Sequence, residues 1–306
     1  MPLVSVVMSV YNDEERVGRS IDSILQQTFQ DFEFIIINDG STDGTVQVLD
    51  RYADQDSRIR VIHQENTGLT QALIRGCQQV QGQFIARQDS GDLSMPERLQ
   101  AQSDFLTNHP DVSLVACSTS FVDPEGNIIF LREQSGYELE QGLVLDIDKI
   151  QNPPHHGSTM FLNSAYHQVG GYRSIFSVAQ DMDLWLRLVE VGRCFCLDSI
   201  LYQASLDKSG ITSTRHKEQL ICAQVAIEAA INRRNQLDES IAFTIFENAD
   251  LNNSKISAKV STSNFYYFLG GCLQKKSPSA ARKYFQRAYR TNPLNWQALL
   301  KILITY

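Results

Sequence analysis

The chain has 306 residues, 42% of them hydrophobic and 20% charged, which is enough to bury a large domain and an appendage. Its formal net charge of −8 argues against a nucleic-acid partner, because binding a phosphate backbone requires a basic face. The six cysteines lack regular spacing and are expected to be reduced thiols. The sequence has neither a signal-peptide pattern nor a membrane-spanning apolar run, so we expect a cytoplasmic protein.

Strands and helices are expected to alternate over the first hundred residues. Nearly continuous apolar runs of strand length predict four strands covered on both faces, at 3–10, 32–37, 58–63 and 84–88. Helices are expected after each of them, from Asn12 to about Gln27, over 45–52, over 67–80 and from Pro96 to Asn108. Asn12 with Glu15, and Ser94 with Glu97, have the spacing of capping boxes. This alternation predicts an α/β fold with a mainly parallel central sheet flanked by helices.

Polar residues follow each of these strands. Tyr11 and Asn12 follow the first strand, Asp39 the second, Asn66 the third and Asp89 the fourth. Because the carboxyl ends of parallel strands meet at one edge of the sheet, we expect these side chains to line one cleft.

The fourth strand ends in two carboxylates, Asp89 and Asp92, which a turn of small residues separates. A divalent cation is bound by such oxygen ligands, and an acidic chain favours cations in its pockets. The alternative is that both residues serve only as turn and helix-cap residues.

The second half begins with a strand over 112–120, which a turn at 123–126 joins to a strand over 128–131, as in a hairpin. An acidic, irregular segment over 132–150 follows, and then His155 and His156. A helix starting near Gln180 carries Asp181 and Asp183 in its first turn, where acidic residues commonly serve only as partners of the helix dipole. Cys194 and Cys196 alternate within a strand-like run and point the same way, but no second cysteine pair lies nearby to complete a metal site.

From about residue 215 the pattern is helical and polar. Residues 280–293 have the small, aromatic, alanine and proline rhythm of a tetratricopeptide helix, and one such unit cannot bury its own face. We therefore expect a main domain over 1–212 and a helical extension over 213–306. The extension is expected to pack on the main domain or on a partner, and peripheral contact with a membrane is the weaker alternative.

Seven collinear motifs resemble family 2 glycosyltransferases over the first ~210 residues. They lie at 4–12, 26–33, 38–43, 66–69, 87–98, 170–172 and 180–187. The resemblance implies the A-type, Rossmann-like nucleotide-sugar fold of that family and leaves the C-terminal helices uncovered.

The resemblance also implies roles for individual residues. The nucleotide sugar would be bound by Ser9, Tyr11, Asn12, Glu14, Asp39, Asn66, Gly68 and Asp89. Asp89 and Asp92 would hold Mn²⁺ or Mg²⁺ on the diphosphate, and Asp181 would be the general base. His156 and Asp183 would lie on the acceptor side. These roles suit the chemistry, because inversion at a sugar carbon needs one base opposite a charge-neutralised leaving group.

Three positions depart from the family pattern. Gly91 occupies the usual third position of the Asp-x-Asp, so either Asp92 reaches the metal through a turn that glycine permits, or Asp89 acts with the diphosphate alone. Asn38 replaces an acid beside Asp39. A histidine that some relatives place after the Leu201–Tyr202 strand is absent, and Asp207 lies in that region.

The sequence thus predicts an inverting, metal-dependent glycosyltransferase. It would move a sugar from a nucleotide diphosphate sugar, UDP-linked, to a hydroxyl of a glycan or lipid-linked acceptor in cell-surface polysaccharide synthesis. The alternative is a non-catalytic nucleotide-sugar sensor or scaffold. A nucleotidyltransferase is disfavoured, because no glycine-rich phosphate loop with a lysine follows the first strand.

Overall fold

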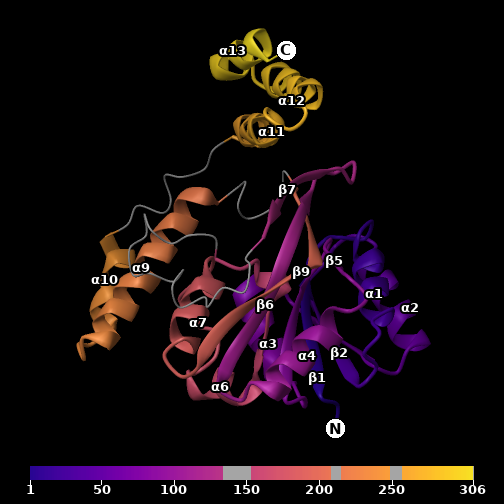
Figure 1. Ribbon diagram of the computed structural model, residues 1–306, viewed down its shortest axis with the longest axis vertical. Coiled ribbons are helices and arrows are strands. Elements are labelled where there is room, and N and C mark those ends of the chain that lie inside the picture. The colour runs from indigo at the N-terminus through magenta and orange to yellow at the C-terminus, as the bar shows by residue number, and fades with distance from the viewer. Residues whose placement is uncertain (134–152, 208–214, 249–256, 306) are drawn as a thin grey trace. The chain divides into compact units, whose positions relative to one another are not determined.

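A computed structural model describes residues 1–133, 153–207, 215–248 and 257–305 (Figure 1). The chain divides into two compact units that interleave along the sequence. The first comprises residues 1–119, 132–204 and 222–247, and the second comprises 120–131, 205–221 and 248–306. The domain boundary expected at 212 and most of the acidic segment expected at 132–150 lie outside the described residues.

The described strands form a sheet in the order β3-β2-β1-β4-β8-β6-β9-β5, with β7 paired to β6. Their bounds are β1 Val4–Val10, β2 Phe32–Asp39, β3 Ile59–Gln64, β4 Phe84–Asp89, β5 Leu93–Ser94, β6 Val112–Val122, β7 Ile128–Arg132, β8 Met160–Leu162 and β9 Arg193–Ser205. The strands β3, β2, β1 and β4 run parallel, whereas β8 is antiparallel to both β4 and β6. The sheet is therefore parallel where the alternating pattern predicted it, and mixed beyond β4.

Helices surround the sheet of the first unit (Figure 1). Their bounds are α1 Val17–Leu25, α2 Thr45–Gln55, α3 Leu69–Cys77, α4 Arg98–Asn108, η1 His156–Ser158, α6 Asn163–Gln168, α7 Gln180–Leu188, α9 His216–Arg234 and α10 Ser240–Asn248. Alternate residues of β2 enter two different cores: Phe34 and Ile36 pack in a cluster with α1, whereas Ile35 and Ile37 pack with Ala72 of α3. Burial on both faces explains why this strand is apolar throughout.

Two expected helix starts are wrong. Asn12 lies in the left-handed region with φ of 50°, and α1 begins only at Val17. Ser94 belongs to β5, which pairs with β9, and its hydroxyl donates to Gln88 Oε1 rather than capping α4. In both cases a tertiary contact takes the side chain that local spacing assigned to a cap.

The second unit contains α11 Ala258–Leu273, α12 Pro278–Thr291 and α13 Trp296–Ile304. Its core is built from these helices and from β7, with Ile129, Phe265, Leu269 and Phe285 buried together.

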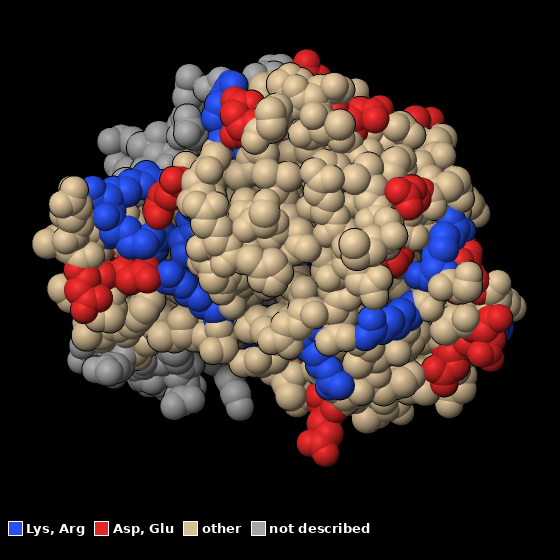
Figure 2. All heavy atoms as spheres, turned by 90° about the horizontal axis from the view of Figure 1, so that it is seen from below, with Lys and Arg blue, Asp and Glu red and all other residues tan. Residues whose placement is uncertain are grey.

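Among the helices that the structure describes, none combines the length and the apolarity needed to cross a bilayer. Figure 2 shows one face of the molecule, on which acidic and basic side chains lie in small mixed groups.

Candidate functional site

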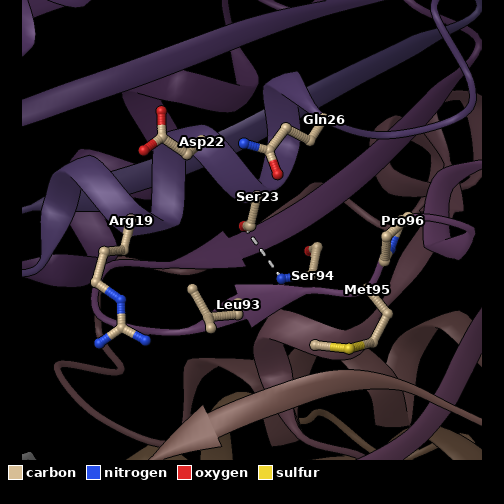
Figure 3. A pocket seen from close by; sticks show the side chains of 8 residues that line it. All are labelled: Arg19, Asp22, Ser23, Gln26, Leu93, Ser94, Met95 and Pro96. Atoms are coloured by element: carbon tan, nitrogen blue, oxygen red, sulfur yellow. Dashed lines mark hydrogen bonds between the residues drawn. The ribbon is translucent and has the colours of Figure 1, made fainter.

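A pocket of about 310 Å³ lies between α1 and β5 (Figure 3). Its lining includes Arg19, Asp22, Leu93 and Met95, and none of the residues expected to act on a ligand. The polar residues that follow the parallel strands gather instead at the carboxyl ends of these strands.

The strand register brings these ends together. Ser9, a half-buried residue near the end of β1, stands opposite Asp89 of β4, and Asp39 of β2 stands opposite Gln64 of β3. The polar side chains that the sequence placed after separate strands thus share one edge of the sheet. Tyr11 follows β1 with its side chain 51% exposed.

Asp89 forms an ion pair with a buried arginine. Arg87 on the same strand is fully buried, and its Nη2 lies 2.7 Å from Asp89 Oδ1. Burial by itself would raise the pKa of Asp89, but the charge of Arg87 and smaller contributions from neighbouring groups together hold that pKa below its usual value. Asp89 is therefore an oriented carboxylate whose surroundings favour the ionised form.

The turn after Asp89 is fixed by Gln88. The Gln88 amide donates to the backbone oxygens of Asp89 and Asp92, at 3.1 and 3.0 Å. Gly91 has φ of 89°, a conformation that a residue with a Cβ rarely adopts. Gly91 stands where the family pattern has the second acid, and its conformation permits the turn that brings Asp92 close to Asp89.

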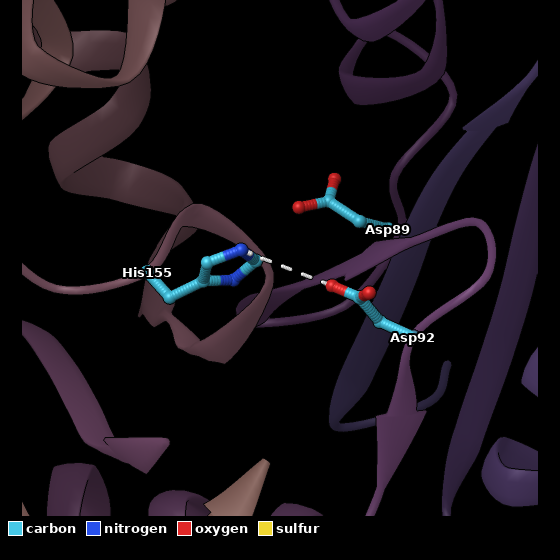
Figure 4. Close-up of side chains that lie close together, drawn as sticks. All are labelled: Asp89, Asp92 and His155. Carbon is cyan, nitrogen blue, oxygen red and sulfur yellow. Dashed lines mark ion pairs between the residues drawn. The ribbon is translucent and has the colours of Figure 1, made fainter. Parts of the chain in front are cut away.

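Asp89, Asp92 and His155 form a candidate metal centre (Figure 4). One ligand atom of each lies within 4.8 Å of the other two, and His155 Nε2 is 3.9 Å from Asp92 Oδ2. Burial lowers the pKa of His155 to about 4, so its ring is neutral, which is the form that binds metals. Two carboxylates with one imidazole are a donor set that suits Mn²⁺.

Asp181 lies in the first turn of α7, as the sequence predicted. Its Oδ1 accepts a 2.9 Å hydrogen bond from the backbone N–H of Met182. Burial raises the pKa of Asp181 to about 6, and the negative charge of Asp89 adds to the increase. The Asp181 and Asp89 carboxylates therefore lie close enough for their charges to interact.

The residues expected on the nucleotide side are tied to neighbouring turns. Asn12 Oδ1 accepts from the backbone N–H of Thr42 at 2.7 Å, and Glu14 Oε2 accepts from that of Gly44 at 2.5 Å. These two contacts bind the loop after β1 to the loop after β2.

Asp39 is almost fully buried and organises a third loop. Its oxygens accept from the backbone N–H groups of Thr67 and Gly68, both at 2.9 Å. Gly40, with φ of 74°, approaches Asn66 so closely that an added Cβ would lie 2.5 Å from the Asn66 nitrogen. The buried Asp39 therefore holds the loop that carries Gly68 and the exposed Asn66.

Comparison with known proteins identifies the family of this chain. The model of glycosyl transferase family 2 matches residues 5–168, more than half of the chain. The chain belongs to this family. The putative glycosyltransferase EpsE of Bacillus subtilis is 35% identical over 215 residues, which cover 67% of this chain and 74% of EpsE.

Longer relatives match only in part. The chondroitin synthase of Pasteurella multocida is 28% identical over 289 residues, which cover 87% of this chain but 29% of that enzyme. The family 2 chain therefore spans less than a third of the synthase.

Solved structures share the fold. TarS of S. aureus, crystallised in complex with UDP, aligns with a TM-score of 0.58 at 18% identity, covering 99% of this chain and 88% of TarS. The mannosyltransferase PcManGT of Pyrobaculum calidifontis, in complex with GDP-Man and Mn²⁺, aligns with a TM-score of 0.57 at 16% identity, covering 99% and 86%. The expected A-type glycosyltransferase fold is confirmed.

Two residues expected on the acceptor side of this glycosyltransferase are buried. His156 Nε2 lies 2.6 Å from the Tyr172 hydroxyl and accepts from Arg87 Nε at 3.2 Å. Asp183 is 1% exposed and pairs with Arg187 at 2.5 Å and Arg173 at 3.6 Å. Nothing in these contacts tests an acceptor role, which stays a prediction for both.

Sequence reasoning missed several residues of the site. It weighed His155 only against His156, and it gave no role to Arg87, Arg132 or Tyr202. The Tyr202 hydroxyl accepts from the backbone N–H of Asp89 at 3.0 Å, and Arg132 lies close enough to Asp181 for their charges to interact. An arginine two residues before the first acid was the one available signal, since a buried charge requires a partner.

The Cys194 and Cys196 thiols are both buried. Within the described residues, the one group of possible metal ligands is the cluster of Asp89, Asp92 and His155.

Proposed function

We propose that this family 2 enzyme is an inverting transferase that moves a sugar from a nucleotide diphosphate sugar, UDP-linked, to an acceptor hydroxyl. The acceptor belongs to a cell-surface glycan or its lipid-linked precursor. The observation that carries the proposal is the pairing of an ionised Asp89 with Asp181, whose pKa is raised to about 6. Two carboxylates with opposite pKa shifts in one site are typical of divided roles in catalysis.

Asp181 is the general base of this proposal. With a pKa of about 6, it is ionised at neutral pH yet basic enough to accept the proton of an attacking hydroxyl. The Met182 N–H fixes one of its oxygens and leaves the other to meet the acceptor. A single displacement with one base inverts the configuration at the sugar carbon, because the hydroxyl attacks the face opposite the leaving group.

Asp89, Asp92 and His155 would hold the divalent cation. A bound Mn²⁺ or Mg²⁺ supplies charge neutralisation for the diphosphate leaving group. Arg87 orients the Asp89 carboxylate that would hold the cation, and Gln88 fixes the turn that carries Asp92. The role of the metal is supported by the Mn²⁺ in the structure of PcManGT, although the identity of the cation is part of the proposal.

The loops after β1, β2 and β3 would bind the nucleotide. Tyr11 is exposed and available to stack on a base, and Asn66 is exposed on the surface that Asp39 organises. TarS has been crystallised with both UDP and UDP-GlcNAc, whereas PcManGT holds GDP-Man. UDP-sugars and GDP-sugars are therefore compared directly as donors.

The test is release of the free nucleotide from a panel of UDP- and GDP-sugars with Mn²⁺. We expect turnover with a UDP-sugar and its loss with a metal chelator. In Asp181→Asn the rate should fall by roughly 10²–10⁴-fold, while affinity for the nucleotide changes by no more than a few-fold. Asp54→Asn, at an exposed position of α2, is the matched control and should retain full activity.

Proton NMR of the product fixes the stereochemistry. A product with the same anomeric configuration as the donor would contradict inversion. Full turnover by Asp181→Asn would contradict the base assignment. Binding of the nucleotide sugar without turnover under any condition would favour the sensor alternative.

A further inference from the structure

The charge of the chain is sharply segregated. Residues 257–305 contain eight of the 27 lysines and arginines and none of the 35 aspartates and glutamates, so this segment carries +8 within a chain of net charge −8. The basic residues are Lys259, Lys275, Lys276, Arg282, Lys283, Arg287, Arg290 and Lys301. All but Lys301 are exposed, and within the described residues only Arg287 among them forms an ion pair, with Glu125.

The last helix of the same unit exposes its apolar face. Trp296, Leu299, Leu300, Leu303 and Ile304 are between 39% and 67% exposed. Their spacing of i, i+3, i+4, i+7 and i+8 places them on one face of α13. Monomeric proteins rarely leave such a continuous apolar face in water.

The opposite face of α13 fixes this orientation. Ala298 is fully buried and Thr305 is 3% exposed. Thr305 Oγ1 accepts from Gln274 Nε2 at 3.2 Å, and Lys301 Nζ donates to Gln274 Oε1 at 2.8 Å. Ile302 packs against the core of the unit from this same side. The helix therefore packs Ala298, Ile302 and Thr305 inward and leaves its longer apolar face exposed.

From these observations we propose that the α11–α13 unit docks on the surface of an anionic lipid bilayer. The unit carries both an exposed apolar face and exposed positive charge, so an occupant that offers an apolar phase together with negative charge complements it. The bilayer interface offers both, with lipid headgroups for the lysines and arginines and acyl chains for the leucines. Trp296 suits this boundary, since its ring is apolar and its N–H still finds a polar partner there. A nucleic acid would match the charge but not the apolar face.

The test measures cosedimentation of the full chain with two kinds of vesicle. One is phosphatidylcholine alone, and the other contains about 30% phosphatidylglycerol, which gives the vesicle surface a negative charge. We expect binding to the anionic vesicles alone, weakening as salt is added. Trp296→Ser/Leu300→Ser/Leu303→Ser removes the apolar face, and Arg282→Gln/Lys283→Gln/Arg290→Gln removes three charges. Each basic residue near an anionic surface is worth about fivefold in affinity, so the charge variant should bind on the order of a hundredfold more weakly.

Matched controls come from exposed residues of the first unit. Leu237 and Ile241 are 57% and 59% exposed, and Leu237→Ser/Ile241→Ser should bind as the parent does. Arg51→Gln/Arg60→Gln, at exposed positions of α2 and β3, removes two positive charges outside the C-terminal helices and should also bind as the parent does. Circular dichroism melting of each variant shows whether the fold is retained.

Three results would overturn the proposal. Binding that is equal for neutral and anionic vesicles excludes the electrostatic component. Parent-like binding by the apolar-face variant shows that α13 is not the docking element. A change from dimer to monomer in that variant, with no lipid binding by the parent, assigns the face to a second copy of the chain.

Discussion

The two carboxylates of the site differ because their immediate neighbours differ. Asp89 has the Arg87 guanidinium 2.7 Å away, and this charge, with smaller contributions from neighbouring groups, lowers the pKa of Asp89 despite burial. Asp181 has no such partner among its described hydrogen bonds, and burial raises its pKa to about 6. Asp89 is thereby suited to hold a constant negative charge, and Asp181 is suited to proton transfer.

The rate should therefore depend on pH through Asp181. The base acts only when ionised, so kcat/KM should be level above pH 7 and fall by about tenfold per pH unit below pH 6. An aspartate with an ordinary pKa would sustain the rate to about pH 4. Initial rates across pH 4.5–8.5, with Mn²⁺ binding recorded at each pH as the control, measure this. A rate that is unchanged down to pH 4.5 would exclude Asp181 as the base.

His155 should contribute directly to metal affinity. In His155→Ala we expect Mn²⁺ to bind at least about tenfold more weakly, because one of three protein ligands is lost. Electron paramagnetic resonance of free Mn²⁺ gives the affinity without any turnover. His167→Ala, at an exposed position of α6, is the matched control. Unchanged affinity in His155→Ala would leave the cation to the two aspartates.

Sequence patterns predicted individual residues well where the residue's role is local. Asp181 lies in the first turn of its helix, and Asp89 ends its strand, as expected. The contact of His155 with the two aspartates could not be predicted, because 63 positions separate it from Asp92 and no periodicity links them. The same holds for the buried pair of Asp183 and Arg187, whose partners depend on how α7 packs.

Close contacts between elements depend on a few glycines, and α11 offers a direct comparison of two of them. A Cβ at Gly270 would lie 2.6 Å from the ring of Phe285 on α12, whereas nothing lies within 4 Å of a Cβ at Gly271. Phe285 is fully buried and has no room to move aside. The close approach of α11 to α12 thus requires glycine at position 270, whereas position 271 has room for a larger residue.

Substitution of these neighbours should change stability in opposite directions. Gly270→Ala should lower the free energy of unfolding by about 1–3 kcal/mol through overpacking. Gly271→Ala should raise it by roughly 0.5–1 kcal/mol, because alanine favours helix at an open site. Urea denaturation followed by circular dichroism measures both, and equal effects at the two positions would contradict the packing.

At this scale the sequence predicted the four parallel strands and the helices between them, because burial on both faces makes such strands continuously apolar. It failed at helix starts. Ser94 belongs to a strand because it pairs with β9, and no pattern in the sequence near Ser94 predicts that pairing.

Each of the two units is built from segments that are separated in the sequence. The hairpin at 120–131 lies in the middle of the catalytic half of the sequence, yet it belongs to the helical unit. Ile129 is fully buried in the core of that unit, and the Tyr284 hydroxyl donates to Asp123 at 2.6 Å and to Glu125 at 2.8 Å. Such contacts span some 160 residues, beyond the reach of any local pattern.

A change in the hairpin should therefore loosen the C-terminal helices. Ile129→Ala removes a buried side chain and should destabilise the second unit by about 2–5 kcal/mol. Hydrogen exchange should become faster over residues 258–291 while β1 and β2 stay protected. The neighbouring Ile128 is 58% exposed, so Ile128→Ala should leave exchange unchanged. Equal exchange in the two variants would show that the hairpin does not support the helices.

The interleaving of the units constrains recombination. A chimera that joined another transferase to residues 215–306 at a single crossover would inherit helices whose core lacks Ile129 and whose Tyr284 faces neither Asp123 nor Glu125. A viable exchange has to carry two pieces of sequence, the short hairpin and the long tail, into the new host together. Descendants of this architecture are therefore expected to inherit both pieces or neither.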